Sequence, residues 1–275
     1  MTYATVMVSL ALDQSNEASL AVAGDVAEKF DACVIGVAAA EFSPPLYYTS
    51  GEAAQSFIDQ GYASINKRMA ELESQFRDAL QKRAKEIDWR SAREMPSTYV
   101  VKQSRAADIL IANGSSSALA DPFTGANPND LVMQIGRPLL LVPPTVQWLD
   151  LRSVLIAWKD CREARRAIVD ALPMLRKAKD ITVAAIVEEE DNPSVVSAGV
   201  EDVVGWLSRH GIFASELVAE GNGSATAQLD RIAADTAAGI VVAGAYGHSR
   251  FREWVLGGMT RHLVADSTRC SLLSR

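Results

Sequence analysis

Four glycines near the C-terminus form the part of this sequence best suited to bind a ligand. After the apolar run AGIVVA come Gly244 and Gly247, which are separated by two residues. Nine residues then lead to Gly257 and Gly258. Glycine lets a backbone adopt positive φ angles and approach a ligand closely. A helix that begins after Gly258 would point its free N–H groups at the same place, and such helix ends bind anions. The spacing predicts a loop that holds phosphate groups.

Nearby charge supports this prediction, but glycine spacing has a second interpretation. Arg250, Arg252 and Arg261 add positive charge around the loop of an otherwise acidic chain. In the second interpretation the glycines only form turns and bind nothing. The spacing by itself leaves both interpretations open.

An internal repeat shows which elements must position this loop. Four apolar runs of the first half recur in the same order in the second half, each short enough for a buried strand. The matched pairs are 4–11 with 152–159, 31–41 with 180–190, 107–114 with 238–245, and 136–144 with 267–275. A duplicated unit is therefore predicted, with five strands in each half.

The stretches between the strands have helical spacing. The first half has apolar residues at Ile65, Met69, Leu72, Phe76 and Leu80, within a long predicted helix from Gly51 to Ile87; the second half has them at Val196, Val200, Val203 and Leu207. Strands that alternate with helices predict a parallel sheet with right-handed crossovers and helices on both faces. In such sheets ligands bind beyond the carboxyl ends of the strands, which is where the glycine loop falls.

Pro143, Pro144 and Thr145 mark the boundary between the halves. We expect an N-terminal domain at 1–145 and a C-terminal domain at 146–275. The last strands, 138–142 and 271–274, would be sheet edges able to pair within one chain, giving an intramolecular pseudo-dimer. Whether two such chains dimerise further stays open.

The run GAYGHSRFREWVLGGMTRHLV resembles the G-x2-G-x9-G-[S/T] signature of universal stress proteins, in the place where that family carries it. Together with the repeat and the strand order, the resemblance covers nearly the whole chain, and it is specific only in the second half. It implies an α/β chain of two tandem Rossmann-like (adenine nucleotide α-hydrolase-like) domains, each a five-stranded parallel sheet with helices on both faces. It also implies ATP binding, with or without Mg²⁺, a role in stress survival, and dimerisation through the last strands.

The resemblance also assigns nucleotide-binding residues. The phosphate and ribose loop would comprise Gly244, Gly247, Gly257, Gly258 and Met259, with Ala243, His248 and Thr260 as further nucleotide-binding residues. At the ends of the first two strands of the second half would lie Ala157, Trp158, Lys159 and Ile186. Ala157, Trp158 and Ile186 would border adenine through backbone contacts.

Two positions depart from the family pattern. The usual Ser or Thr after the third glycine is Gly258, which keeps an amide donor but lacks a hydroxyl, and Thr260 is the candidate substitute. Lys159 replaces an Asp, so it either meets a phosphate or weakens the site. The first half has Gly114 and Gly125 but not the paired-glycine spacing, and we expect it to bind no nucleotide tightly and to act as a dimer partner fused in cis.

Composition excludes several classes of protein. A formal net charge of −7 leaves no basic surface for nucleic acid. Cys33, Cys161 and Cys270 are odd in number and far apart, so they predict neither a disulfide framework nor a metal site. The N-terminus lacks a signal-peptide pattern, and no apolar stretch approaches the ~20 residues needed to span a bilayer. A cytoplasmic protein without membrane contact is expected.

No catalytic signature is present. The sequence lacks G-x-S-x-G, G-x4-G-K-[S/T] and H-E-x-x-H, and no residues are grouped for a metal. His210 is interpreted as a capping residue, His248 as a possible phosphate contact, and His262 as facing phosphate or solvent. ATP hydrolysis is therefore expected to be slow or absent.

Two main functions follow. The first is an ATP-binding stress-response protein in which nucleotide in the second half changes a surface read by unidentified protein partners. The alternative is a nucleotide-free protein-interaction scaffold with a decayed pocket. An enzyme of the same broad fold group is a third possibility for which the sequence supplies no residue set.

Overall fold

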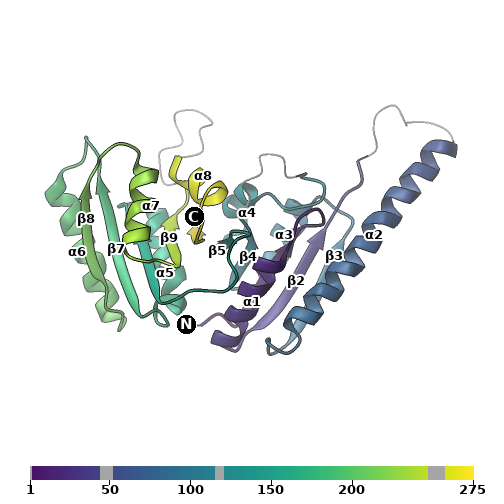
Figure 1. Ribbon diagram of the computed structural model, residues 1–275, viewed down its shortest axis with the longest axis horizontal. Coiled ribbons are helices and arrows are strands. Elements are labelled where there is room, and N and C mark those ends of the chain that lie inside the picture. Colours follow the sequence, from purple (N-terminus) through teal and green to yellow (C-terminus); the bar gives the residue numbers. More distant parts are fainter. Residues whose placement is uncertain (1, 44–51, 115–120, 247–257) are drawn as a thin grey trace.

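The strands of both halves join in one continuous ten-stranded sheet covered by helices (Figure 1). The computed structural model describes residues 2–43, 52–114, 121–246 and 258–275. The first half comprises β1 (Thr5–Leu10), α1 (Glu17–Phe30), β2 (Cys33–Ala39), α2 (Glu52–Leu80), β3 (Ile87–Ala92), α3 (Pro96–Gln103), η1 (Ser104–Ala106), β4 (Ile109–Asn113), α4 (Pro128–Gln134) and β5 (Leu139–Val142). The second comprises β6 (Ser153–Ala157), α5 (Arg162–Leu175), β7 (Asp180–Val187), α6 (Pro193–Arg209), β8 (Ser215–Glu220), α7 (Ala225–Asp235), β9 (Ile240–Gly244), α8 (Gly258–Ala265) and β10 (Cys270–Ser274).

Both halves have the predicted parallel arrangement. The strand order is β3-β2-β1-β4-β5-β10-β9-β6-β7-β8, so β1 and β6 lie at the centre of their halves. All pairings within a half are parallel. The predicted α/β class with helices on both faces is confirmed.

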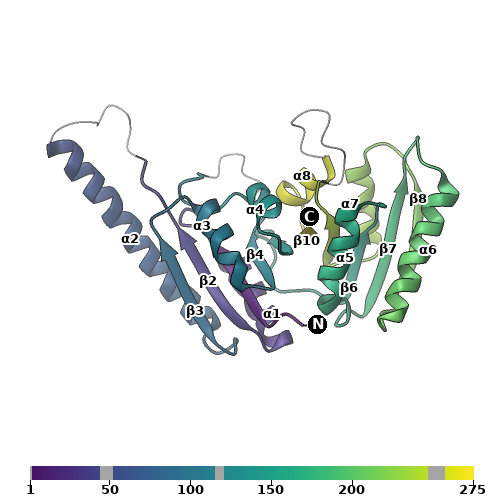
Figure 2. The ribbon, with the colours of Figure 1, turned by 180° about the vertical axis from the view of Figure 1, so that it is seen from behind.

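The two five-stranded halves meet through an antiparallel pair. Leu140 of β5 lies opposite Leu272 of β10, and Leu139 lies opposite Leu273. All four side chains are fully buried. Neither last strand is therefore an open edge, and the elements of the two halves lie on either side of this central pair (Figures 1 and 2).

Side chains alternate between the two faces of the sheet. Along β6, Val154 and Ile156 pack in the layer formed with α1, α2, α5 and α6, whereas Leu155 packs in the layer formed with α3, α4, α7 and α8. This period of two is the expected geometry of a strand buried on both faces. Helices thus cover both faces of each half.

The long helix of the first half ends earlier than predicted. It was expected to run to Ile87, but α2 ends at Leu80 and Ile87 begins β3. Leu80 is the last fully buried residue of the helical stripe, and Arg83 just beyond it forms ion pairs with Asp25 and Glu28 of α1. These contacts hold the chain in a turn, so that Ile87 can pair with Val34 of β2.

Candidate functional site

The carboxyl ends of β6 and β9 lie side by side in the second half. Ala157 of β6 is in register with Ala243 of β9 on one side and with Ala184 of β7 on the other. The helix after β6, α5, packs on one face of the sheet, and the helix after β9, α8, packs on the other. In open α/β sheets, ligands bind in a crevice at such a switch point. We therefore take this edge, called the crevice below, as the candidate site. The structure thus brings Ala157, Ala243 and the neighbouring strand that contains Ile186 to one edge.

Gly244 ends β9, and its lack of a side chain is explained by α5. A Cβ at this position would lie 2.4 Å from the backbone nitrogen of Ala164 and 2.6 Å from the carbonyl carbon of Glu163. Real Cβ atoms do not approach backbone so closely. Glycine is therefore needed here for helix–strand packing, whether or not a ligand binds.

Trp158 follows β6 and points away from α8. Its backbone N–H donates to the Ala184 carbonyl oxygen at 2.7 Å, and its side chain is 8% exposed. The indole joins the core layer of α5 and α6, beside Gly199 of α6, in a groove that Trp206 also lines. The indole therefore belongs to the helix packing, and the backbone is the part of Trp158 that borders the crevice.

Lys159 bridges the ends of two strands. Its Nζ lies 2.8 Å from Oε2 of Glu188, which follows β7, and both side chains are substantially exposed. The acidic run of 188–191 folds as a turn, in which the Asp191 side chain accepts from the Glu188 N–H. Exposed ion pairs contribute about 0–1 kcal/mol. The ammonium group can therefore exchange its carboxylate partner for another anion at little cost.

Tyr246 has a conformation that the sequence did not reveal. Its φ of 62° is left-handed, which is uncommon for a residue with a side chain. Its N–H donates to Oγ1 of Thr260 at 3.2 Å, and its hydroxyl donates to Oδ1 of Asn129 in α4 at 3.0 Å. Burial raises the pKa of the Tyr246 phenol, as does the charge of Asp130. The only sequence signal for this role was its position between Gly244 and the next glycine.

Thr260 is buried and already has a partner. It is 5% exposed, and its hydroxyl accepts from Tyr246, so it ties the start of the loop to α8. Gly258, the first residue of α8, is exposed, and a Cβ there would meet no atom of the described residues within 4 Å. Met259 is partly buried against the layer of α7 and α8. Of these three residues, Gly258 offers free space at the helix end.

Glu163 is an acidic group close to the crevice. It lies in the first turn of α5 and is 8% exposed. Burial acts to raise the pKa of its carboxyl, but hydrogen bonds from its own N–H and from Arg162, with the charge of Arg162, outweigh burial and lower that pKa. The carboxylate is thus held ionised at the N-terminus of α5, where the helix dipole favours negative charge.

Two histidines lie apart from the crevice. His210 caps α6, as expected, and its ring packs against Trp206 with centroids 4.3 Å apart. His262 was expected to face phosphate or solvent; instead its side chain is 17% exposed and its Nε2 lies 2.9 Å from Asp230 of α7. Because α7 packs on α8, the face of α8 that carries His262 is largely covered. Gly247, His248 and Gly257 lie outside the described residues.

At the same edge of the first half, described side chains join the ends of β1 and β4, and a groove of about 980 Å³ opens beside them between α1 and α2. Asn16 is 4% exposed; its Oδ1 accepts from the Ala11 N–H at 3.0 Å, and its Nδ2 donates to the Ala11 carbonyl oxygen at 2.8 Å. Asn113 at the end of β4 donates to Asn16, and the Leu12 N–H donates to the carbonyl oxygen of Thr124. A cavity of about 20 Å³ remains beside Ala11 and Asn113. That volume suits a single water molecule.

Within the described ranges, no group of three or more His, Cys, Asp or Glu residues is placed to hold a metal ion. None of the helices described combines the length and the apolar character that crossing a bilayer demands.

Comparison with known proteins adds to this picture. No family model matches the chain, and no curated protein matches it. Among solved structures, a universal stress protein from Archaeoglobus fulgidus DSM 4304 superposes with a TM-score of 0.73 at 13% identity, over 98% of this chain and 96% of that one. A functionally unknown protein from Pseudomonas aeruginosa PAO1 gives a TM-score of 0.55 at 13% identity, over 99% and 92% of the two chains. A candidate universal stress protein from Pseudomonas aeruginosa UCBPP-PA14 gives 0.59 at 14% identity, over 99% and 93%.

These structures match over nearly their whole lengths, so the likeness includes both halves and the way they join. Identities of 13–14% establish a shared fold. The chain therefore has the fold of a universal stress protein, with two copies of the α/β unit in one polypeptide.

Proposed function

We propose that this chain is a universal stress protein that binds an adenine nucleotide, ATP, in its second half. The observation that carries the proposal is the contrast between two equivalent edges. In the first half, hydrogen bonds of Asn16 and Asn113 join the ends of β1 and β4. In the second half the matching edge, at Ala157 and Ala243, is followed by the glycine-rich sequence and by the exposed start of α8 at Gly258.

The chemistry of the second edge suits a phosphate chain. The first N–H groups of α8 have no partner within the helix and carry partial positive charge. Gly258 leaves them accessible. Lys159 follows β6, the strand beside β9, and has an exposed, exchangeable partner. Adenine would lie against the backbone of Ala157 and Trp158 and beside Ile186, with the phosphates toward the residues from Gly244 to Thr260.

The first half then serves as a dimer partner fused in cis. We place the division at residues 145 and 146, in the segment between β5 and β6. Nucleotide occupancy would change the surface around α8 and the loop before it, which protein partners would read in the cytoplasm. Because the sequence carries none of the common nucleotide-hydrolase signatures, hydrolysis would be slow or absent.

A charge substitution at Gly258 tests the nucleotide site. Gly258→Asp puts a carboxylate where the phosphates would lie, in open space and at a helix end that favours negative charge, so the fold should be kept or slightly stabilised. Gly258→Asn is the neutral control of the same size. Calorimetric titration with ATP and thermal unfolding with increasing ATP should show binding to the wild type. Ligand at a hundredfold its Kd stabilises the folded state by ~2.7 kcal/mol.

We expect ATP binding to be weakened at least ~tenfold by the Asp variant and much less by the Asn variant, because only the former repels phosphate. Equal binding by both variants and the wild type would place any nucleotide elsewhere. Absence of binding to the wild type at millimolar ATP would support the scaffold instead. Two observations favour that alternative: Lys159 is paired with Glu188, and the Thr260 hydroxyl is used by Tyr246.

A further inference from the structure

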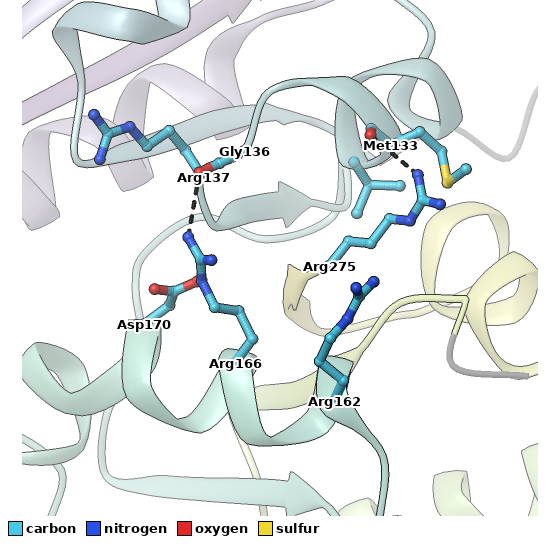
Figure 3. A pocket seen from close by; sticks show the side chains of 8 residues that line it. Met133, Gly136, Arg137, Arg162, Arg166, Asp170 and Arg275 are labelled. Carbon is cyan, nitrogen blue, oxygen red and sulfur yellow. Dashed lines mark hydrogen bonds and ion pairs between the residues drawn. The ribbon is translucent and has the colours of Figure 1, made fainter.

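A second cavity, of about 320 Å³, lies between the two halves and is lined by four arginines. Arg162 and Arg166 come from the first two turns of α5, Arg275 follows β10, and Arg137 precedes β5. Val132, Met133, Gly136 and Asp170 complete the lining. In Figure 3 the side chains of Arg162, Arg166 and Arg275 extend into one space, while that of Arg137 extends away from them.

Within the part of the chain that the structure describes, these arginines use few of their hydrogen-bond donors. A guanidinium has five N–H donors. Arg166 contacts Asp170 at 3.1 Å and the Gly136 carbonyl oxygen at 3.5 Å, Arg275 contacts the Met133 carbonyl oxygen at 3.2 Å, and Arg162 contacts Glu163 at 2.9 Å. The two contacts that reach the first half are long for charged donors. Holding the halves together therefore does not account for the cluster.

The opposite end of the same strand pair provides an internal comparison. Because β5 and β10 are antiparallel, another cavity, of about 280 Å³, lies where β5 ends and β10 begins. Its lining contains one arginine, Arg269, and one acid, Asp266. Joining the halves thus creates a cavity at each end but does not require arginines in it. The arginines are therefore concentrated at one end of the junction, although the chain as a whole has a net charge of −7.

We propose that the cavity at Arg162, Arg166 and Arg275, which we call the arginine cleft, binds a small anion that carries two or more phosphate groups. Planar guanidinium groups bind phosphate oxygens in bidentate pairs. Among the described residues of the lining Asp170 is the only acid, and Arg166 already pairs with it. The volume lies at the lower end of the range for ligand pockets, so it suits a compact anion better than a large metabolite. An anion held there would contact both halves.

This proposal is independent of the nucleotide site, and pyrophosphate is the probe that tests it. The full-length protein is titrated calorimetrically with pyrophosphate at low and at physiological ionic strength. Arg162→Gln and Arg275→Gln are the test variants. Arg275 contacts a carbonyl oxygen, whereas Arg162→Gln also removes the partner of the buried Glu163, so thermal unfolding of each variant is measured beside its titration. Arg269→Gln in the other cavity is the matched control. We expect at least ~tenfold weaker binding for each test variant and no change for the control. Binding should also weaken as salt rises, because the side chains of Arg162 and Arg166 are 72% and 50% exposed and salt screens exposed charges.

Several results would overturn the arginine cleft as a phosphate site. These are no heat of binding with the wild type at low salt, an equal loss in Arg269→Gln, or binding that survives the double variant of Arg162 and Arg275. Binding removed by Gly258→Asp would place the anion at α8 rather than in the cleft. Tighter binding of a dicarboxylate such as succinate would contradict the assignment to phosphate.

Discussion

Gly244 and Gly258 lie at the two ends of one glycine motif, yet they meet different surroundings. Gly244 lies against the backbone of α5, whereas a Cβ at Gly258 would contact none of the described residues. The spacing of glycines in the sequence does not distinguish these two positions. At the scale of single residues, the structure separates a glycine needed for packing from one that leaves room for a ligand.

Alanine at the two positions should therefore have unequal effects on stability. Gly244→Ala forces α5 and β9 apart, because the new Cβ would lie 2.4 Å from the Ala164 nitrogen, and overpacking of this kind costs about 1–3 kcal/mol. Gly258→Ala should change the free energy of unfolding by less than ~0.5 kcal/mol. Urea unfolding of both variants provides the measurement. Equal stabilities would show that α5 does not pack on β9 as described.

The turn between β1 and α1 shows how an element can close a binding edge. Asn16 precedes α1 and uses its side-chain amide on both backbone polar groups of Ala11. Asn113 and Ser19 extend this network to β4 and α1. The second half has Cys161 before α5 in place of this asparagine, and a cysteine side chain has no amide that could bond both polar groups of a backbone residue. The two turns thus differ in whether they seal the strand ends.

Removal of the Asn16 side chain should destabilise the first half. Asn16→Ala leaves the N–H and carbonyl of the buried Ala11 without these partners, which costs about 1–3 kcal/mol. Ser15→Ala is the control, because Ser15 is exposed and its hydroxyl is 3.4 Å from the Glu17 nitrogen. Chemical denaturation compares the two, and a cost for Asn16→Ala no greater than that of the control would contradict a sealing role.

At the scale of the whole molecule, the halves share one sheet through β5 and β10. Leu140 and Leu272 lie opposite each other, come from different halves, and are both fully buried in the same core layer. Burial of these strands between β4 and β9 makes the junction part of the core. We therefore expect the chain to unfold as one cooperative unit.

A double-mutant cycle measures this coupling. Leu140→Ala and Leu272→Ala should each cost about 2–5 kcal/mol, and their combined effect should depart from additivity by about 0.5–3 kcal/mol because the side chains are opposed. Leu140→Ala combined with Leu207→Ala in α6 is the remote control, expected to be additive. Unfolding is followed by calorimetry. Two separate transitions, or additivity at the junction, would mean that the halves are independent.

The sequence by itself determined the elements and their repetition. Apolar runs such as 152–159 and 238–245 predicted β6 and β9, because a strand buried on both faces must be continuously apolar and this property is local to the run. The stripe at Met69, Leu72 and Phe76 likewise predicted α2, although not its end. The sequence also marked the glycine motif, since spacing along the chain is visible without coordinates.

Only the tertiary structure decided what each marked residue touches. The ion pair of Lys159 with Glu188, the hydrogen bond of Tyr246 to Asn129, and the packing of Gly244 on α5 each join segments that are separate in the sequence. The arginine cleft is the clearest case, because Arg137 and Arg275 are 138 positions apart in the chain and line one cavity only after β5 pairs with β10. Local sequence fixes periodicity and turn chemistry, whereas contacts between distant segments depend on strand order and register, which folding of the whole chain sets.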